Sequence, residues 1–137
     1  MAELTRFSVS VEKDVLEQFE RQIRNQQYPT RSKAIADLIR ESLVEKEWAG
    51  GDEIAGAVIL VYDHHKRDLT NKLTHIQHDF HHLIISTQHM HLDHDNCLEI
   101  VAVKGKPGEV QDLAERLRAA KGVKHGSLAM ATTGRAI

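Results

Sequence analysis

The sequence of 137 residues predicts an α+β fold in two parts, a β-α-α segment over residues 1–48 and a βαββαβ segment over residues 53–133. Three observations predict it. Alternation of polar and apolar residues gives way to helical spacing within the first part. A glycine pair flanked by charged residues then marks a linker over Glu47–Asp52. Beyond it, four apolar runs and two helical patterns follow in the order of the ferredoxin-like split unit.

The residue pattern of the first part predicts one strand and two helices. Residues Arg6–Val11 alternate polar and apolar side chains, which is typical of a half-exposed strand. A helical pattern starts near Val15 and ends at Tyr28-Pro29, and Thr30 is suited to cap a second helix. A part this small, with a single strand, can neither pair its strand edges nor bury its apolar faces. We therefore expect it to be half of an intertwined dimer.

The residue pattern of the second part predicts four strands and two helices. Its strands are apolar, and each helix carries an apolar stripe. We expect strands over residues 54–62, 83–92, 97–104 and 123–130, a helix over residues 67–80, and a second helix between the turn at residues 105–108 and Gly122.

Composition excludes several classes of protein. The 18 Lys and Arg nearly balance the 20 Asp and Glu, and residues 1–48 hold 8 basic against 9 acidic side chains, so DNA binding would depend on where charges lie. The sequence has no apolar run long enough for a membrane span and no leader pattern. The single Cys97 fits a reducing compartment. We therefore expect a cytoplasmic protein that does not enter a membrane.

Histidines are the most unusual feature, since nine of the ten lie between residues 64 and 94. On a strand, His89 and His91 project from the same face, and a five-residue hairpin loop returns Cys97 beside His91. The same register places Glu99 opposite His89, where its carboxylate can orient an imidazole ligand. Two imidazoles and a thiolate suit nickel, copper or zinc. The alternative is an edge strand with incidental histidines and a buried free cysteine.

A second group of histidines lies on the predicted helix that ends near residue 80. His75, His78 and His82 share one helical face at i, i+3, i+7 spacing. Either they are solvated residues at a helix end, or one of them supplies a fourth metal ligand within the subunit or across an interface. The remaining histidines are candidates for weaker sites or plain surface.

The first predicted strand has features of a DNA-reading element. Arg6, Ser8 and Ser10 share one face, and two such strands paired in a dimer form a ribbon that fits the major groove, where Arg pairs with guanine. By spacing alone, an ordinary edge strand is the favoured interpretation. Arg31 and Ser32 open the second helix, where free backbone N–H groups suit a phosphate.

Lys66 and Arg67 open the first helix of the second part, either as surface charges or as phosphate contacts. The sequence contains no nucleophile–base pair, no phosphate-binding glycine loop and no His-Glu-x-x-His zinc motif. We therefore do not expect an enzyme.

Four stretches resemble the nickel-responsive transcriptional regulators of bacteria: Arg6–Val11, Tyr62–Leu69, Ile76–His78, and His89-Met90-His91 through Cys97–Ile100. The resemblance covers nearly the whole chain. It implies a ribbon-helix-helix DNA-binding domain joined to an ACT-like regulatory domain, assembled as a homotetramer that is a dimer of dimers. It also implies Ni²⁺ as the cofactor and double-stranded operator DNA as the partner.

Carried over by position, the resemblance implies roles for residues of this chain. His89, His91 and Cys97 of one subunit, with His78 of a neighbouring subunit, would bind nickel. Arg6, Ser8 and Ser10 would contact DNA bases. Lys66 and Arg67 would contact DNA phosphates.

One departure concerns a second, hard-cation site that the family holds between its two domains. This sequence has Lys33 where the family has a carboxylate, although Asp37 remains. The departure puts a bound cation there in doubt, and the Lys33 ammonium is a candidate to replace its charge.

The residues by themselves are compatible with three other functions. An amino-acid-sensing module would need no soft ligands, and a nickel store or chaperone would need no DNA-reading strand. A metal hydrolase needs an open coordination position and a general base, for which Glu99 is the one near candidate. A closed set of four ligands argues against the hydrolase.

Overall fold

The computed structural model describes residues 2–137, which form two compact units, one ending at Glu41 and the other beginning at Ser42. Met1, the first residue of the predicted N-terminal part, lies outside the described residues. None of the helices within residues 2–137 combines the length and the apolar run that crossing a bilayer requires.

Two helices begin the described chain. Helix α1 spans Lys13–Asn25 and helix α2 spans Arg31–Ala49, so both helices that the spacing predicts are present. The hydroxyl of Thr30 accepts a hydrogen bond from the backbone N–H of Lys33 at 3.1 Å, so Thr30 caps α2 as expected. Large apolar side chains of this region stay exposed in the single chain, namely Phe7, Val9, Val11, Val15, Leu38 and Ile39.

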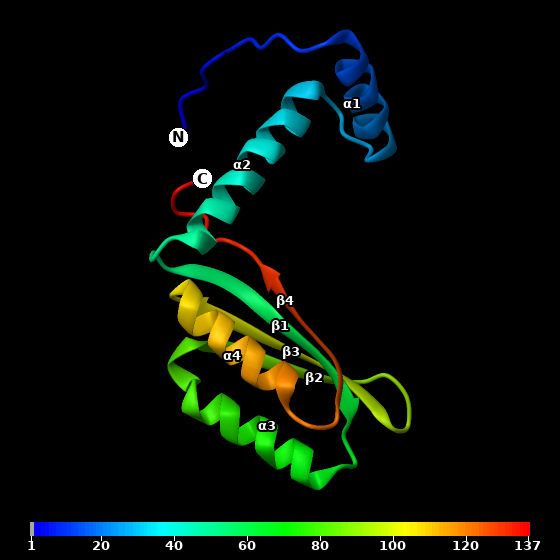
Figure 1. Cartoon of the computed structure of the whole chain (residues 1–137), viewed down its shortest axis with the longest axis vertical. Coiled ribbons are helices and arrows are strands. Elements are labelled where there is room, and N and C mark those ends of the chain that lie inside the picture. Colours follow the sequence, from blue (N-terminus) through cyan, green and yellow to red (C-terminus); the bar gives the residue numbers. More distant parts are fainter. Residues whose placement is uncertain (1) are drawn as a thin grey trace. The chain divides into compact units, whose positions relative to one another are not determined.

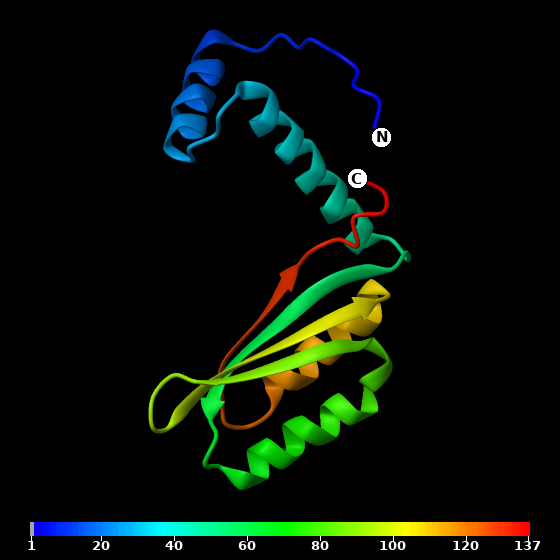
Figure 2. The ribbon, with the colours of Figure 1, turned by 180° about the vertical axis from the view of Figure 1, so that it is seen from behind.

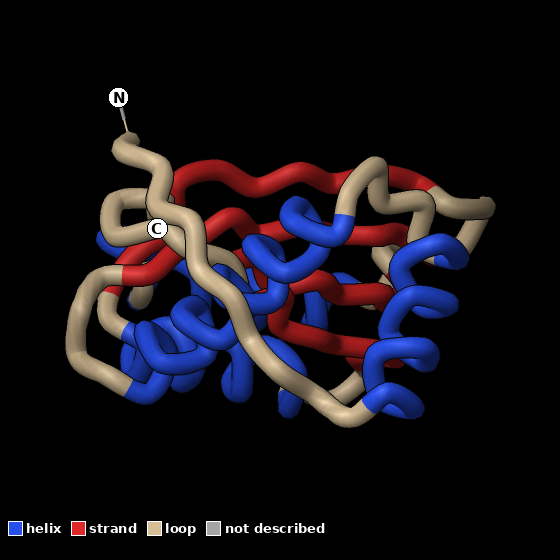
Figure 3. Tube along the Cα trace, turned by 90° about the horizontal axis from the view of Figure 1, so that it is seen from above, coloured by secondary structure: helices blue, strands red, loops and turns tan. Residues whose placement is uncertain are grey.

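The strand expected over Arg6–Val11 is absent from the single chain as described: these residues form a loop before α1 (Figure 3). A strand needs a neighbour with which to exchange backbone hydrogen bonds. No segment among residues 2–137 pairs with Arg6–Val11. The prediction of a strand is therefore wrong for one chain by itself, because the expected pairing partner is the same segment of a second chain.

The second unit has the predicted βαββαβ order (Figure 1). Its four strands form one antiparallel sheet in the order β2-β3-β1-β4. A short 3₁₀ turn, His81–Leu83, precedes β2. The strands are β1 Ile54–Asp63, β2 Ile84–His91, β3 Asn96–Gly105 and β4 Val123–Met130, and the helices are α3 Arg67–Asp79 and α4 Pro107–Ala119.

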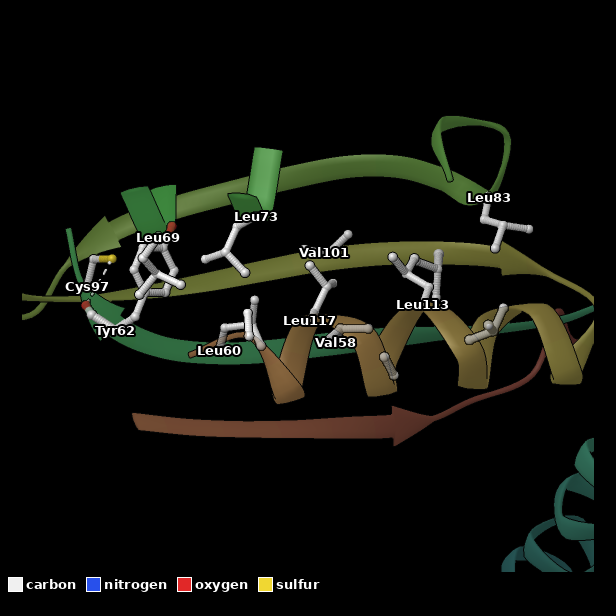
Figure 4. Packing of buried hydrophobic residues seen from close by; sticks show 14 of the residues in the cluster. Val58, Leu60, Tyr62, Leu69, Leu73, Leu83, Cys97, Val101, Leu113 and Leu117 are labelled. Carbon is white, nitrogen blue, oxygen red and sulfur yellow. Dashed lines mark hydrogen bonds between the residues drawn. The ribbon is translucent and has the colours of Figure 1, made fainter. Parts of the chain in front are cut away.

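Both helices of this unit cover the same face of the sheet, and the other face is left uncovered (Figures 1 and 2). The covered face carries every second residue of β1 and β3, as period-two alternation requires. Figure 4 shows these side chains packed against the helices. The fully buried members of the core include Val58, Leu60, Tyr62, Leu73, Val101, Leu113 and Leu117.

The linker expected over Glu47–Asp52 begins later in the structure, because α2 continues to Ala49. Trp48 is only 6% exposed within the core of the second unit, and its indole N–H donates to the carbonyl of Ala131 at 2.9 Å. The hydroxyl of Thr132 donates to the Glu47 carboxylate at 3.1 Å. Burial of one aromatic ring therefore extends the helix past its predicted end.

Trp48 also packs where a glycine lets two backbones come close. A Cβ atom added to Gly56 would meet the carbonyl oxygen of Ala129 at 2.7 Å and the Trp48 ring at 3.3 Å. We expect Gly56→Ala to lower the free energy of unfolding by about 1–3 kcal/mol, since neither the strand backbone nor the buried ring can move freely. Urea denaturation at fixed protein concentration measures the change.

Gly108→Ala is the matched control. A Cβ at Gly108, in the first turn of α4, would meet nothing within 4 Å. This variant should keep its stability or gain up to about 1 kcal/mol, because alanine is the better helix former. Equal losses in both variants would contradict the close approach at Gly56.

Candidate functional site

The hairpin of β2 and β3 has the register that the sequence predicts. His91 pairs with Cys97 and His89 pairs with Glu99, which puts all four side chains on the face that the helices cover. The rings of His89 and His91 have centroids 5.6 Å apart. Two imidazoles therefore stand along one strand, with a thiol on the neighbouring strand.

Cys97 is fully buried, and its thiol donates a hydrogen bond to the carbonyl of Tyr62 at 3.4 Å (Figure 4). Burial raises the pKa of the Cys97 thiol, so the side chain is protonated at neutral pH. With the thiol turned toward β1, the ligand atoms of Cys97, His89 and His91 do not all lie within 4.8 Å of one another. A metal here would displace the thiol proton.

Glu99 is a buried carboxylate, 5% exposed, with two strong donors. The hydroxyl of Tyr62 donates to one oxygen at 2.7 Å, and the side-chain amide of Gln77 donates to the other at 2.6 Å. Nδ1 of His89 lies 3.7 Å from the first oxygen, so the carboxylate faces the imidazole as expected. Sequence reasoning missed Tyr62 and Gln77, although the alternation along β1 places Tyr62 on the covered face.

His64 joins this group from the loop after β1. Its ring centroid lies 4.4 Å from that of His91 and 6.5 Å from that of His89. Its Nδ1 is buried and has no hydrogen-bond partner among residues 2–137. Burial, reinforced by the neighbouring His65 and His91, lowers the pKa of His64 and keeps it neutral.

His78 is placed elsewhere on the same chain. It lies in the last turn of α3, is exposed, and has its ring contact with His81 at 5.9 Å. Its ring contacts within the described chain do not include His89 or His91. One subunit thus brings together three of the four predicted nickel ligands on the hairpin and leaves the fourth at a helix end.

The donor set fits nickel. Two imidazoles and a thiol on adjacent strands are borderline-soft ligands of the kind that Ni(II) takes, and the buried carboxylate beside His89 can hold that ring in one tautomer. The buried Nδ1 of His64, which has no hydrogen-bond partner among residues 2–137, adds a further nitrogen at the same end of the sheet.

The predicted DNA contacts are all exposed. In the first unit, Arg31 is the first residue of α2 and pairs with the Glu20 carboxylate. In the second unit, Lys66 is the N-cap of α3 and Arg67 its first residue, as expected. The others lie in the loop before α1 or at the start of α2, namely Arg6, Ser8, Ser10 and Ser32.

Lys33 stands at the position where the resemblance implies a carboxylate ligand for a second cation. Its Nζ lies 2.6 Å from Oδ1 of Asp37, and the hydroxyl of Tyr28 donates to Oδ2 at 3.0 Å. The hydrogen bonds from Lys33 and Tyr28 hold the pKa of Asp37 below its usual range. An ammonium group therefore supplies positive charge to this carboxylate from within the same helix.

A family model described as the NikR C terminal nickel binding domain matches residues 55–131. A relative from Syntrophus aciditrophicus, named as a nickel-responsive regulator, is 55% identical over 134 residues and covers 98% of both chains. A relative of the same name from Chlorobium limicola is 53% identical over 134 residues, covering 98% of this chain and 100% of its own.

A solved structure with low sequence identity to this chain shows similarity in fold only. An uncharacterized protein from Thermotoga maritima superimposes with a TM-score of 0.52 at 11% identity, covering 57% of this chain and 96% of its own.

The Tyr62–Glu99 contact predicts a pH-dependent stability in the metal-free protein. Burial, and then the hydrogen bond to Glu99, raise the pKa of Tyr62 far above its ordinary value of 10.0. The unfolded chain loses the phenol proton first, so the wild type should lose stability as the pH rises above about 10. Tyr62→Phe should cost about 1–3 kcal/mol at pH 7, because Glu99 loses a donor, and should flatten the alkaline slope.

Urea denaturation at pH 7, 9 and 11 measures both effects. Tyr28→Phe is the control, since it removes a half-buried phenol of the first unit that donates to Asp37. An alkaline slope that persists in Tyr62→Phe and disappears in Tyr28→Phe would contradict the assignment.

Proposed function

The chain belongs to the nickel-responsive regulator family, and on that premise we propose that it is a nickel-dependent, DNA-binding transcriptional regulator. Nickel bound where regulatory domains meet promotes operator binding by paired ribbon-helix-helix dimers and so controls genes of nickel homeostasis. Residues 1–48 act as the DNA-binding and dimerisation domain, and residues 53–133 as the metal-binding and tetramerisation domain. The observation that carries the proposal is the strand register that sets His91 opposite Cys97.

The nickel site consists of His89, His91 and Cys97 of one subunit and His78 of a neighbouring subunit. His89 and His91 are on one strand face and Cys97 is their neighbour on β3, so a thiol released from the Tyr62 carbonyl would give a three-donor set. His78 of α3 is exposed, and its ring contacts within the described chain do not include the hairpin's histidines, which suits a ligand given to another subunit. Nickel bound to these four ligands would link two subunits through metal–ligand bonds.

Glu99 positions the site without touching the metal. Its carboxylate is fixed by Tyr62 and Gln77, so it presents a constant acceptor to the His89 ring. The pairing holds the other ring nitrogen free for nickel.

DNA reading is assigned to the segment before α1. In two paired copies of Arg6–Val11, Phe7, Val9 and Val11 share one face while Arg6, Ser8 and Ser10 share the other. The three apolar residues are 64%, 69% and 51% exposed in the single chain, which supports a second copy as their cover. Phosphates are then contacted by Arg31, Ser32, Lys66 and Arg67.

A homotetramer is supported by the uncovered face of the sheet. Its side chains alternate with the core residues and are largely apolar along the two central strands. Covering this face with a second copy would hide apolar area that a single chain leaves in water. The residues concerned are Ala57, Ile59, Val61, Leu98, Ile100 and Ala102.

Nickel acts on DNA binding through the assembly. Ligands drawn from two subunits fix how those subunits meet, and this biases where the paired DNA-reading ribbons lie. Such coupling is reciprocal, so operator DNA must tighten nickel binding by the same factor by which nickel tightens operator binding.

Cys97→Ala tests the metal site. The variant should lose the thiolate-to-nickel absorption band and all nickel-dependent gain in operator affinity, while keeping its fold. Absorption titration with Ni²⁺ and a DNA mobility shift with and without Ni²⁺ measure the two losses. His75→Ala, an exposed histidine of the same helix as His78, should leave both intact.

A mixing experiment separates the subunits' contributions. His78→Ala and His89→Ala should each abolish high-affinity nickel binding alone, and their mixture should recover part of it through sites built from both chains. Nickel-dependent operator binding retained in Cys97→Ala would refute the assignment.

Arg6→Ala tests the DNA-reading residue. We expect specific operator binding to weaken by about 1–3 kcal/mol, because a guanine contact is lost, with nickel affinity of the free protein preserved. Fluorescence anisotropy with an operator duplex and a scrambled duplex gives the specificity ratio. Arg21→Ala, a basic residue of α1, is the control for loss of charge alone. Unchanged operator affinity in Arg6→Ala would remove its base-reading role.

A further inference from the structure

The tail that follows β4, residues 131–137, runs beside the last turn of α2 in both views of the ribbon (Figures 1 and 2). The tail and residues 42–49 of α2 belong to the second unit, so the contacts between them lie inside one compact unit. The residues assigned above to nickel and to DNA all lie outside the tail. Its contacts with α2 therefore call for an explanation of their own.

Two consecutive residues of α2 bond to two consecutive residues of the tail. The indole N–H of Trp48 donates to the carbonyl of Ala131 at 2.9 Å. The hydroxyl of Thr132 lies 3.1 Å and 3.2 Å from the two carboxylate oxygens of Glu47. The backbone N–H of Ala131 donates to the carbonyl of Ala55 at 3.0 Å, so the tail is itself fastened to β1. The end of α2 is thus tied to the sheet through the tail.

Apolar packing holds the same part of α2 from the side of the core. Trp48 is buried within the core of the second unit, and Val44, one turn earlier, packs against that core. Gly56 leaves room for the Trp48 ring, which lies 3.3 Å from the position of an added Cβ. A buried indole usually has a partner for its N–H, and the tail supplies it here. Packing therefore holds the ring, and the tail fixes its orientation.

The tail is ordered by hydrogen bonds of its own. The backbone N–H of Gly134 donates to the hydroxyl oxygen of Thr132 at 3.1 Å, at a φ of 79° that favours glycine. A hydroxyl has one proton and two lone pairs. Since Thr132 accepts from Gly134, its proton remains available for the Glu47 carboxylate. The turn at Gly134 therefore orients Thr132 toward α2.

These contacts span the glycine pair Gly50-Gly51, which lies between α2 and β1. Two glycines in a row have the backbone freedom of a hinge. The contacts of Glu47 and Trp48 with the tail and with β1 close the chain on either side of this pair. Helix α2 runs without interruption from Arg31 to Ala49 and has residues in both units. The contacts that hold its last turn therefore act on a helix that continues into the first unit.

We propose that residues 131–134 form a clasp that locks the end of α2 to the second unit, so that the glycine pair does not act as a free hinge. The clasp lets α2 pass a change in the second unit on to the DNA-reading unit. This second statement rests on the proposed function. With the clasp open, the glycine pair would absorb the change, so nickel would bind as before but would bias operator binding less.

Hydrogen exchange followed by mass spectrometry tests the clasp by itself. Thr132→Val keeps the shape of the side chain and removes its hydrogen bonds. Backbone amides of residues 44–53 should exchange about two- to tenfold faster in this variant, because one hydrogen bond that holds the last turn is lost. The double variant Trp48→Phe with Thr132→Val should exchange faster still. Residues 107–119 of α4 should keep their wild-type rate in both variants.

Thr133→Val is the matched control, since the Thr133 hydroxyl accepts from the backbone N–H of Arg135 at 3.4 Å within the tail. It should leave the exchange of residues 44–53 unchanged. Wild-type exchange of residues 44–53 in both clasp variants would overturn the clasp. Equal acceleration in Thr133→Val, or in α4, would also overturn it, because the change would then not be local to the Thr132 contact.

Operator affinity with and without Ni²⁺ tests the transmission. In the double variant the ratio of the two affinities should fall by about tenfold, while calorimetry with Ni²⁺ shows the wild-type nickel affinity. Adding Gly50→Ala and Gly51→Ala should restore part of the ratio, because alanine stiffens the joint. A Cβ at Gly51 would meet nothing within 4 Å, and one at Gly50 would make only ordinary contacts.

The two measurements separate the possible failures. A wild-type affinity ratio in the double variant, together with fast exchange of residues 44–53, would overturn the transmission while the clasp stands. A reduced ratio that the two alanines do not raise would also overturn it, because the loss would not come from a freed hinge. If nickel leaves operator binding of the wild type unchanged, the proposed function fails, and the exchange rates still decide on the clasp.

Discussion

The buried carboxylate of Glu99 is the contact on which the end of the sheet that carries the proposed nickel ligands depends. Through Tyr62 and Gln77 it ties together β3, β1 and α3 at one point, and it also faces the His89 ring. A buried charge without donors is costly, so the three elements are held in one arrangement by the need to satisfy it.

Patterns that are local in the sequence predicted most of this fold. Alternation along the strands and the length of the hairpin loop together gave the register that sets Cys97 opposite His91. Contacts between distant elements had no such signal: Tyr62 is 37 residues from Glu99, and His64 reaches His91 only through folding. The pattern at Arg6–Val11 indicated a strand whose partner is not in the same chain, and tertiary burial of Trp48 overrode the linker signal of the glycines that follow it.

Both units leave apolar surface that a single chain does not cover. In the first unit it lies around the segment before α1 and on α2, and in the second unit on the helix-free face of the sheet. The hydrophobic effect therefore favours assembly at two separate places. A metal site shared between subunits needs such an assembly to exist beforehand, because ligands from two chains must already be near each other.

Trp48 is the sole tryptophan of the sequence, and it is seated in the core of the second unit with its N–H bonded to the carbonyl of Ala131. The protein thus contains a built-in fluorophore whose emission comes from one known location. A red shift of that emission reports water entering the contact between the end of α2 and the tail after β4, with no label attached. Local opening there can be distinguished from global unfolding by comparing fluorescence with circular dichroism on the same sample.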